Sequence, residues 1–310
     1  MAVKLQEPEF VYMNGKLTKW ADATLHIGTE AVTRSLNVFE GLKGYWQKDG
    51  SFGIVFMRRH YERLLRSAKL MHLPCPWSYG EYESAVHELL GALLTKEQDM
   101  WARVTLFGVE GHWGVGTKSD MVVTAYNQRK EQPAPIKIGI STWQRSGDNA
   151  LPYRVKAGAN YEVGRLARIE GARLGYSDMI LLNSAGRVSE ATASCVVMVR
   201  DGVVYTTPHY EGSLESVTLD FVAEIAKSLG YEFVVRPIDR TELMIADELA
   251  LVGSLAELVP VEEVDGFQLN PNGKIITAIR KRFFAIVRGE DNSLDAEFSF
   301  VPNDQIRSLD

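Results

Sequence analysis

Hydrophobic and polar positions alternate with a period of two along much of the chain, which predicts strands. Residues 9–20 read EFVYMNGKLTKW and predict two short strands joined at Asn14-Gly15, a dipeptide typical of tight hairpins. The same alternation predicts further strands at residues 38–43, 54–57, 101–107 and 121–126. The glycine-rich run GVEGHWGVG separates the last two of these strands and predicts a loop too long for a tight turn.

Other segments repeat their apolar residues with the helical period. Helices are predicted at residues 58–71, 79–95, 161–174, 216–229 and 275–287, with a short one beginning at Thr241. Gly175 and Gly230 directly follow two of these helices, as expected of residues that end a helix.

The second half of the chain alternates between such helices and short strands. Strands are predicted at residues 136–143, 179–182, 195–199, 203–206, 231–236 and 249–252, and another from residue 188 onward. The polar, proline-containing run QRKEQPAP precedes this half and predicts a linker. We therefore expect domains at 1–128 and 136–310 with a linker at 129–135, and a frayed or loosely packed tail after Gly289.

Composition narrows the class of protein. The chain has 310 residues, 45% of them apolar and 24% charged, which is typical of a globular protein of about two domains. A net charge of −6 without a basic stripe argues against nucleic acid, and no apolar run is long enough to serve as a signal core or to span a membrane. The two cysteines, Cys75 and Cys195, are typical of a reducing compartment, so we expect a cytoplasmic protein.

Two charged residues lie among small neighbours. Lys156 occurs in VKAGANY, where crowding can keep a lysine amine neutral for covalent chemistry, although an ordinary surface lysine fits the same run. Glu190 occurs in VSEAT just after a predicted hairpin, where a carboxylate is either solvated or paired with a positive group.

Two hydroxyl-rich turns complete the candidates. Ser216-Val217-Thr218 opens a helix and Gly253-Ser254 ends a strand, so both can bind an anion or serve only as a helix cap and a plain turn. Together with Lys156 and Glu190 they match what pyridoxal phosphate requires: an amine for an imine, a carboxylate for the ring nitrogen, and a phosphate cradle. No metal site is predicted.

Motifs along almost the whole chain are similar to those of one enzyme family. They are VFEGLKGY at 38–45, HYERLLRSAK at 60–69, W-x-R at 143–145, KAGANY at 156–161, VSEATAS at 188–194, SVT at 216–218 and GSLAELVPV at 253–261. In this order and spacing the chain resembles the class IV, fold-type IV pyridoxal-phosphate aminotransferases, and among them the branched-chain amino acid aminotransferases. The resemblance implies the two-domain α+β fold of D-amino acid aminotransferase, with a smaller N-terminal α/β domain and a larger C-terminal domain around a barrel-like β core.

The resemblance also implies roles at the cofactor. Lys156 is expected to hold the cofactor as a Schiff base and to carry the proton, Tyr161 to bond the phenolic oxygen, and Glu190 the ring nitrogen. The phosphate is expected to bind at Val217, Thr218, Gly253 and Ser254. Family members usually have an arginine where this chain has Phe56, and we expect Arg58 to act as a shifted phosphate ligand.

On the substrate side the resemblance implies a pocket with departures from the family. The expected substrate residues are Arg34, Phe39, Gly41, Lys43, Trp101, Arg103, Leu255 and Ala256. Tyrosines are usual where this chain has Arg34 and Trp101, and Leu255 narrows the pocket. Arg34 and Lys43 either bind the substrate carboxylate or are solvated.

The expected function is a ping-pong transaminase that moves an amino group between a branched-chain-like amino acid and a 2-oxo acid. The alternatives are an (R)-amine transaminase with a ketone acceptor, a D-amino acid transaminase, a lyase of the aminodeoxychorismate type and, least in keeping with the retained lysine, a non-enzymatic binding module. The family forms homodimers that share loops, so we expect at least a homodimer in which GVEGHWGVG reaches the partner.

Overall fold

The computed structural model describes residues 7–307, which form two compact units. The first unit combines residues 7–131 with residues 287–307, and the second is the continuous stretch Gln132–Ile286. The expected domains at 1–128 and 136–310 remain predictions. Among the described residues, no helix is long and apolar enough to cross a membrane.

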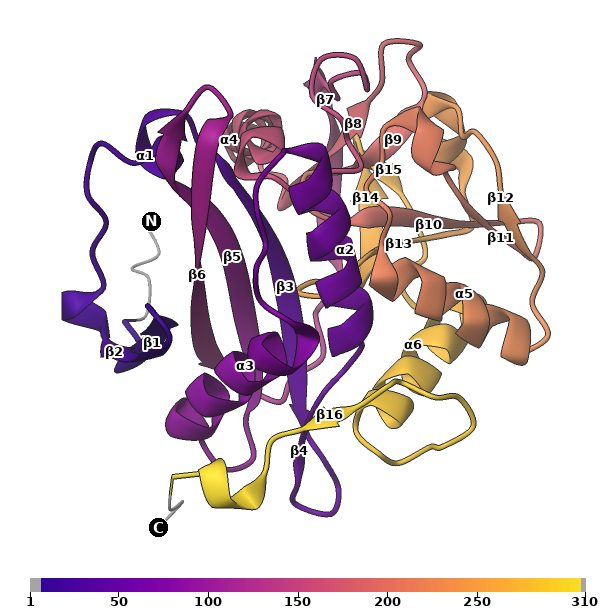
Figure 1. Ribbon diagram of the computed structural model, residues 1–310. Helices are drawn as coiled ribbons and strands as arrows, with labels where there is room; N and C mark the ends of the chain where they lie inside the picture. The colour runs from indigo at the N-terminus through magenta and orange to yellow at the C-terminus, as the bar shows by residue number, and fades with distance from the viewer. Residues whose placement is uncertain (1–6, 308–310) are drawn as a thin grey trace. The chain divides into compact units, whose positions relative to one another are not determined.

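The first unit is one antiparallel sheet with helices on it (Figure 1). Its strands are β1 (Phe10–Met13), β2 (Lys16–Lys19), β3 (Asn37–Trp46), β4 (Phe52–Ile54), β5 (Asp99–His112), β6 (Val115–Gln128) and β16 (Ser299–Phe300). Its helices are α1 (Glu30–Thr33), α2 (Met57–Leu70) and α3 (Tyr79–Leu93), with short 3-10 helices at Trp20–Asp22 and Asn303–Gln305. The sheet order is β16-β4-β3-β5-β6-β1-β2.

Alternation along the central strands gives this sheet two different faces. On β5 the side chains of Ala102, Val104 and Leu106 are fully buried, whereas those of Trp101 and Arg103, which alternate with them, are half-buried. Helices α2 and α3 lie on the sheet in Figure 1, where α2 contacts β3 and α3 contacts β6 and β1. The half-buried face is therefore the one available for polar chemistry.

The expected loop at GVEGHWGVG is wrong. Strands β5 and β6 run through most of it and leave only Trp113 and Gly114 as the turn, both with positive φ. Two irregularities in the β5–β6 register, at Gly108/Glu110 and Glu110/His112, absorb residues that sequence alone assigns to a loop.

Two other local expectations in this unit are also wrong. The strand expected at 54–57 ends at Ile54, and Phe56 has a left-handed backbone that starts α2 at Met57. The tail after Gly289 is not loosely packed, because β16 pairs with β4 and the side chains of Ala296 and Val301 are buried.

The second unit contains a mixed sheet, also shown in Figure 1. Its strands are β7 (Ile136–Gln144), β8 (Asp178–Leu182), β9 (Val188–Ala191), β10 (Cys195–Arg200), β11 (Val203–Thr206), β12 (Phe233–Val235), β13 (Glu248–Gly253), β14 (Glu257–Val264) and β15 (Phe267–Gln268). Its helices are α4 (Glu162–Leu174), α5 (Val217–Ser228) and α6 (Lys274–Val287), with 3-10 helices at Gly158–Tyr161, His209–Glu211 and Arg240–Ile245. The strand order is β12-β11-β10-β13-β14-β7-β8-β9, with β15 paired to β14.

This sheet curls around an apolar core. Side chains from β7, β8, β9, β10, β13 and β14 meet in one buried cluster that includes Ile180, Val196 and Leu251. The predicted helices and strands of this unit are confirmed within a few residues, whereas β14 was missed. The curled sheet brings the β7–α4 connection, β9, and the turn before α5 to the site described next.

Candidate active site

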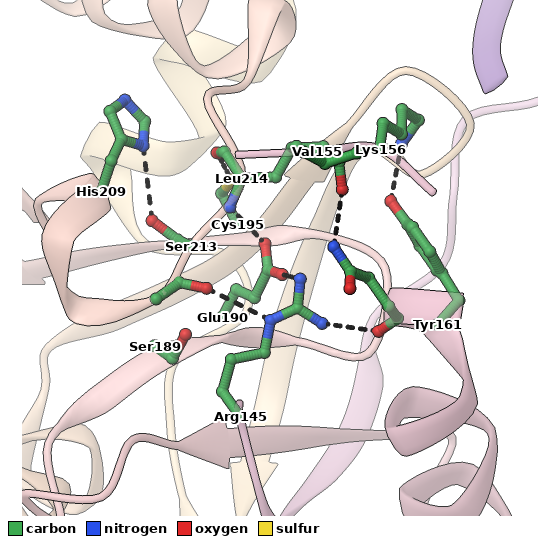
Figure 2. Close-up of polar contacts among 12 residues, drawn as sticks. Arg145, Val155, Lys156, Tyr161, Ser189, Glu190, Cys195, His209, Ser213 and Leu214 are labelled. Carbon is green, nitrogen blue, oxygen red and sulfur yellow. Dashed lines mark hydrogen bonds and ion pairs between the residues drawn. The ribbon is translucent and has the colours of Figure 1, made fainter. Parts of the chain in front are cut away.

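The lysine segment connects β7 to α4. Val155 and Ala157 are buried on either side of Lys156, so the backbone is anchored while the lysine side chain is only half-buried. A short 3-10 turn, Gly158–Tyr161, then leads into α4 and places Tyr161 back over the lysine. Lys156 Nζ donates a hydrogen bond of 2.7 Å to the Tyr161 hydroxyl, as drawn in Figure 2.

Asn160 fixes the backbone of this segment. Its side-chain amide donates to the Val155 carbonyl at 2.7 Å and to the Pro152 carbonyl at 2.9 Å. Its own backbone N–H donates to the Ala157 carbonyl at 3.1 Å. The buried Asn160 therefore holds the residue before Lys156 through its side chain and the residue after it through its backbone N–H.

Glu190 lies on β9 with only 5% of its surface exposed. Its Oε1 pairs with Arg145 Nη2 at 2.9 Å, and its Oε2 accepts from the Leu214 backbone N–H at 3.1 Å. A buried carboxylate is costly unless it is paired in this way. Since each carboxylate oxygen has two acceptor sites, Glu190 retains capacity for a further donor.

Arg145 is a residue whose role sequence reasoning missed. It lies just after β7, is 7% exposed, and also donates to the Gly212 carbonyl through Nε and to the Asn160 carbonyl through Nη1. The W-x-R motif contained it, but spacing alone gives no hint that it meets Glu190, which is far along the chain. Figure 2 shows the guanidinium between these partners.

The two predicted hydroxyl turns come together. Thr218 Oγ1 and Ser254 Oγ lie 3.1 Å apart and are hydrogen-bonded. Thr218 is in the first turn of α5, where backbone N–H groups have no partner within the helix and favour an anion. Ser216 Oγ caps the helix through the Leu219 N–H at 3.2 Å.

The turn between β13 and β14 contains the remaining predicted residues of this unit. Gly253 ends β13 and Ser254 follows it, both half-buried. Leu255 is 50% exposed, whereas Ala256 packs against the apolar core of the sheet. Of the two, Leu255 alone has a largely exposed side chain.

The first unit brings five predicted substrate residues to one face of its sheet. Phe39, Gly41 and Lys43 alternate along β3, and Gly41 pairs with Arg103 and Lys43 with Trp101 on β5. The Arg103 guanidinium lies 3.8 Å from the centre of the Phe39 ring, and Lys43 Nζ bonds to the Gln128 side chain. Directly opposed residues of an antiparallel pair point to the same side, so these side chains share a surface.

Trp101 forms an aromatic surface on this face. Its ring stacks on Tyr126 with 5.7 Å between centroids and an interplanar angle of 18°. A methyl group at Gly41 would lie 3.3 Å from the Trp101 indole nitrogen, so the glycine leaves room for the larger ring.

The opposite side of β3 is held by a buried ionic cluster that sequence reasoning did not identify. Glu40, between Phe39 and Gly41, accepts from Arg63 at 2.7 and 2.8 Å and lies 2.7 Å from His60 Nδ1, both on α2. Burial alone raises the pKa of Glu40, but Arg63 and His60 outweigh it and lower the pKa to about 2. Strand β3 is thereby fixed to α2.

Two predicted arginines contact aromatic rings within the first unit. The Arg58 guanidinium lies 3.9 Å from the centre of the Tyr79 ring. The Arg34 guanidinium lies 4.7 Å from the centre of the Trp113 ring and 3.6 Å from Glu30. A phosphate role for Arg58 and a substrate role for Arg34 remain predictions.

Comparison with known proteins identifies a family that the chain matches. The sequence profile of the amino-transferase class IV family matches residues 37–264. The branched-chain-amino-acid aminotransferase of Escherichia coli strain K12 is 30% identical over 297 residues, which cover 92% of this chain and 95% of the relative.

Solved structures agree with the sequence comparison. The branched-chain aminotransferase of Thermoproteus uzoniensis, solved with norvaline, is 29% identical with a TM-score of 0.89, and covers 95% of this chain and 100% of its own. The branched-chain amino acid aminotransferase of Thermobaculum terrenum in its PLP form is 31% identical with a TM-score of 0.88, covering 96% and 100%.

Proposed function

The chain belongs to the class IV aminotransferase family, and we propose that it moves an amino group between a branched-chain-like amino acid and a 2-oxo acid in a ping-pong cycle. It is an aminotransferase with the fold-type IV architecture, and its cofactor is pyridoxal 5'-phosphate. The branched-chain relatives favour this activity over an (R)-amine transaminase, a D-amino acid transaminase or a lyase.

The side chains of the second unit fit this cofactor. A half-buried lysine, a phenol at 2.7 Å from its nitrogen, a buried carboxylate with acceptor capacity, and paired hydroxyls at a helix N-terminus occur in one unit. When bound, pyridoxal phosphate supplies the electron sink that makes the Cα proton of an amino acid removable. The Lys156–Tyr161 contact is the observation that carries the proposal.

Each residue then has a definite task. The amine of Lys156 holds the cofactor covalently and, once released, accepts and returns the proton at the substrate Cα. The Tyr161 hydroxyl orients that amine, and Glu190 accepts a hydrogen bond from the ring nitrogen. Val217, Thr218, Gly253 and Ser254 bind the phosphate through N–H and hydroxyl groups.

Each unit contains some of the proposed substrate residues. Lys43 and Arg103 supply positive charge beside Phe39 and Gly41, and Trp101 supplies an indole N–H where the family usually has a tyrosine. Leu255 and Ala256 border the substrate from the β13–β14 turn. Arg34 serves as a further carboxylate partner, and Arg58 as a phosphate ligand.

Half-reactions test this function. We expect the protein with bound cofactor to change absorbance when L-leucine or L-glutamate is added without an acceptor, and Lys156→Ala to abolish the change. Separate half-reactions with L-leucine, with each enantiomer of 1-phenylethylamine and with D-alanine distinguish the substrate classes. A response only to the (R)-amine or to D-alanine would refute the branched-chain specificity.

A homodimer is the second part of the proposal. Large apolar side chains at the β5–β6 turn and on helix α1 beside it are exposed; they are Val32 at 53%, Trp113 at 75% and Val115 at 78%. Such a cluster is typical of a protein interface, and a second copy of the chain is its proposed partner.

Light scattering of the purified protein checks the dimer. We expect the mass of at least two chains for the wild type and a shift toward one chain for Trp113→Ser combined with Val115→Ser. Exchange of the exposed Phe267, which lies in the other unit, serves as the control and should not alter the mass. A monomeric wild type would contradict the proposal. We also propose a cytoplasmic location, supported by a sequence with only two cysteines, Cys75 and Cys195, and testable by cell fractionation.

A further inference from the structure

Arg145 connects three separate segments of the second unit. Through Nη2 it reaches Glu190 on β9, through Nε the Gly212 carbonyl in the turn before α5, and through Nη1 the Asn160 carbonyl in the lysine segment. The three contacts are 2.9, 3.2 and 2.9 Å long. All four residues are buried, so each contact is made away from bulk water.

Asn160 extends this connection to the reactive lysine. Its carbonyl accepts from Arg145, while its side chain donates to the carbonyls of Pro152 and Val155. Val155 directly precedes Lys156. A continuous set of hydrogen bonds therefore runs from the carboxylate of Glu190 through Arg145 and Asn160 to the backbone of Lys156.

The turn at Gly212 closes the set from the other side. The Gly212 carbonyl accepts from Arg145, and two residues later the Leu214 N–H donates to Glu190 at 3.1 Å. Arg145 thus orients one carboxylate oxygen of Glu190 directly. The other oxygen is oriented by the Leu214 N–H, which belongs to the turn that Arg145 holds at Gly212.

We propose that Arg145 is a positioning residue for transamination, which with Asn160 fixes the separation and orientation of Glu190 and Lys156 on opposite parts of the cofactor ring. This inference rests on the proposed function and names two residues that the function itself did not require. Arg145 touches neither reacting atom; it acts through Glu190 and through the backbone of the lysine segment.

The chemistry of the side chain explains why an arginine occupies this position. A guanidinium offers several N–H donors in a rigid plane, so it can bond a carboxylate and two carbonyls at fixed angles. A lysine keeps the charge but has one nitrogen on a flexible stem. Arg145→Lys therefore separates charge from geometry.

The first experiment compares Arg145→Lys with the wild type. We expect kcat for the L-leucine half-reaction to fall on the order of 10²-fold, because a small misplacement of catalytic groups has a large effect on rate. The KM for L-leucine should change far less. Titration of the apoprotein with pyridoxal phosphate should give weaker binding, and the pH midpoint of the bound cofactor's absorbance should shift.

Arg154→Lys is the matched control. Arg154 also lies in the chain segment between β7 and α4 and is partly exposed. It pairs with Asp148 and Glu215 at 3.3 Å each. We expect its kcat, cofactor affinity and pH midpoint to equal those of the wild type. A merely structural role for Arg145 would lower the thermal midpoint of the apoprotein and leave kcat and the pH midpoint of the folded variant unchanged, which would overturn the proposal.

Asn160→Ala provides a second route that leaves Arg145 in place. It removes the bonds to Pro152 and Val155 and should also lower kcat with little change in KM. Because both residues act in one set of bonds, the double variant should lose less than the product of the two single losses. Multiplicative losses would contradict a shared role, whereas a wild-type protein that binds no pyridoxal phosphate would refute the proposed function itself.

Discussion

At Gly212 the main chain passes unusually close to the site. Its φ is +101°, and a methyl group there would lie 3.0 Å from Ser189 Oγ and 3.2 Å from Arg145 Cγ. Ser189 Oγ is itself buried without a hydrogen-bond partner among the described residues. A glycine at this position is required by both backbone and space.

Gly212→Ala is therefore expected to lower the free energy of unfolding by about 2 kcal/mol or more and to displace Arg145. Gly202→Ala is the control, since Gly202 also has a positive φ, +79°, but no atom within 4 Å of the added carbon. Urea unfolding of both variants checks the difference. Equal losses would mean that backbone strain alone matters.

The residue scale also shows what the sequence could reveal of the site. Lys156, Tyr161 and Glu190 were found because small neighbours and motif order marked them, and the lysine and tyrosine are indeed hydrogen-bonded. Their roles in catalysis stay predictions. Arg145 and Asn160 were missed because a bridging role depends on which segments the curled sheet brings together, and no spacing along the chain encodes that.

Among the elements, strand β3 and helix α2 are joined by Glu40 and its partners. The pKa of Glu40 is lowered from 4.5 to about 2, so its ionic contacts stabilise the folded state above the unfolded value near 4.5. This stability is lost as the pH falls from about 4.5 toward 2, because the unfolded chain then binds a proton that the folded chain does not.

Glu40→Gln is expected to reduce the free energy of unfolding at pH 7 by about 3 kcal/mol and to flatten its dependence on pH between 4.5 and 2. Glu110→Gln is the control; its pair with Lys118 is 64–69% exposed and should contribute little. Denaturant unfolding at a series of pH values measures both. An unchanged pH dependence in Glu40→Gln would contradict the assignment.

Elements with a strong period were predicted well, and elements defined by pairing were not. Helices α2 and α3 and the hairpin at Asn14-Gly15 are confirmed within a few residues. In contrast, β14 was missed. The end of β5 and the start of β6 were predicted as loop because of their many glycines. Pairing with a neighbouring strand overrides local propensity at these positions.

At the scale of the whole molecule, the α+β fold, the family, the transaminase activity and the cofactor predicted from motifs are confirmed. The domain limits remain predictions. The expectation of a loosely packed tail after Gly289 was wrong, since β16 pairs with β4 in the first unit; just before that tail, Arg288 pairs with the buried Asp99 at 2.8 and 3.1 Å. Local hydropathy cannot reveal a partner so distant in sequence.

Arg288→Gln is expected to lower the free energy of unfolding by about 3–5 kcal/mol, because it leaves the Asp99 carboxylate buried without its cation. Arg307→Gln is the matched control: its pair with Glu9 is about 60% exposed on both sides and should contribute less than about 1 kcal/mol. Thermal and denaturant unfolding distinguish the two. A loss at Arg288 as small as that at Arg307 would refute the importance of the buried pair.

The return of residues 287–307 to the first unit sets an order of events during synthesis of the chain. The second unit is continuous, so all of its strands are translated before Ser299 and Phe300. The first unit begins earlier in the chain but cannot complete its sheet until those residues pair with β4. The unit that begins earlier in the chain therefore completes its sheet only after the whole of the other unit has been translated.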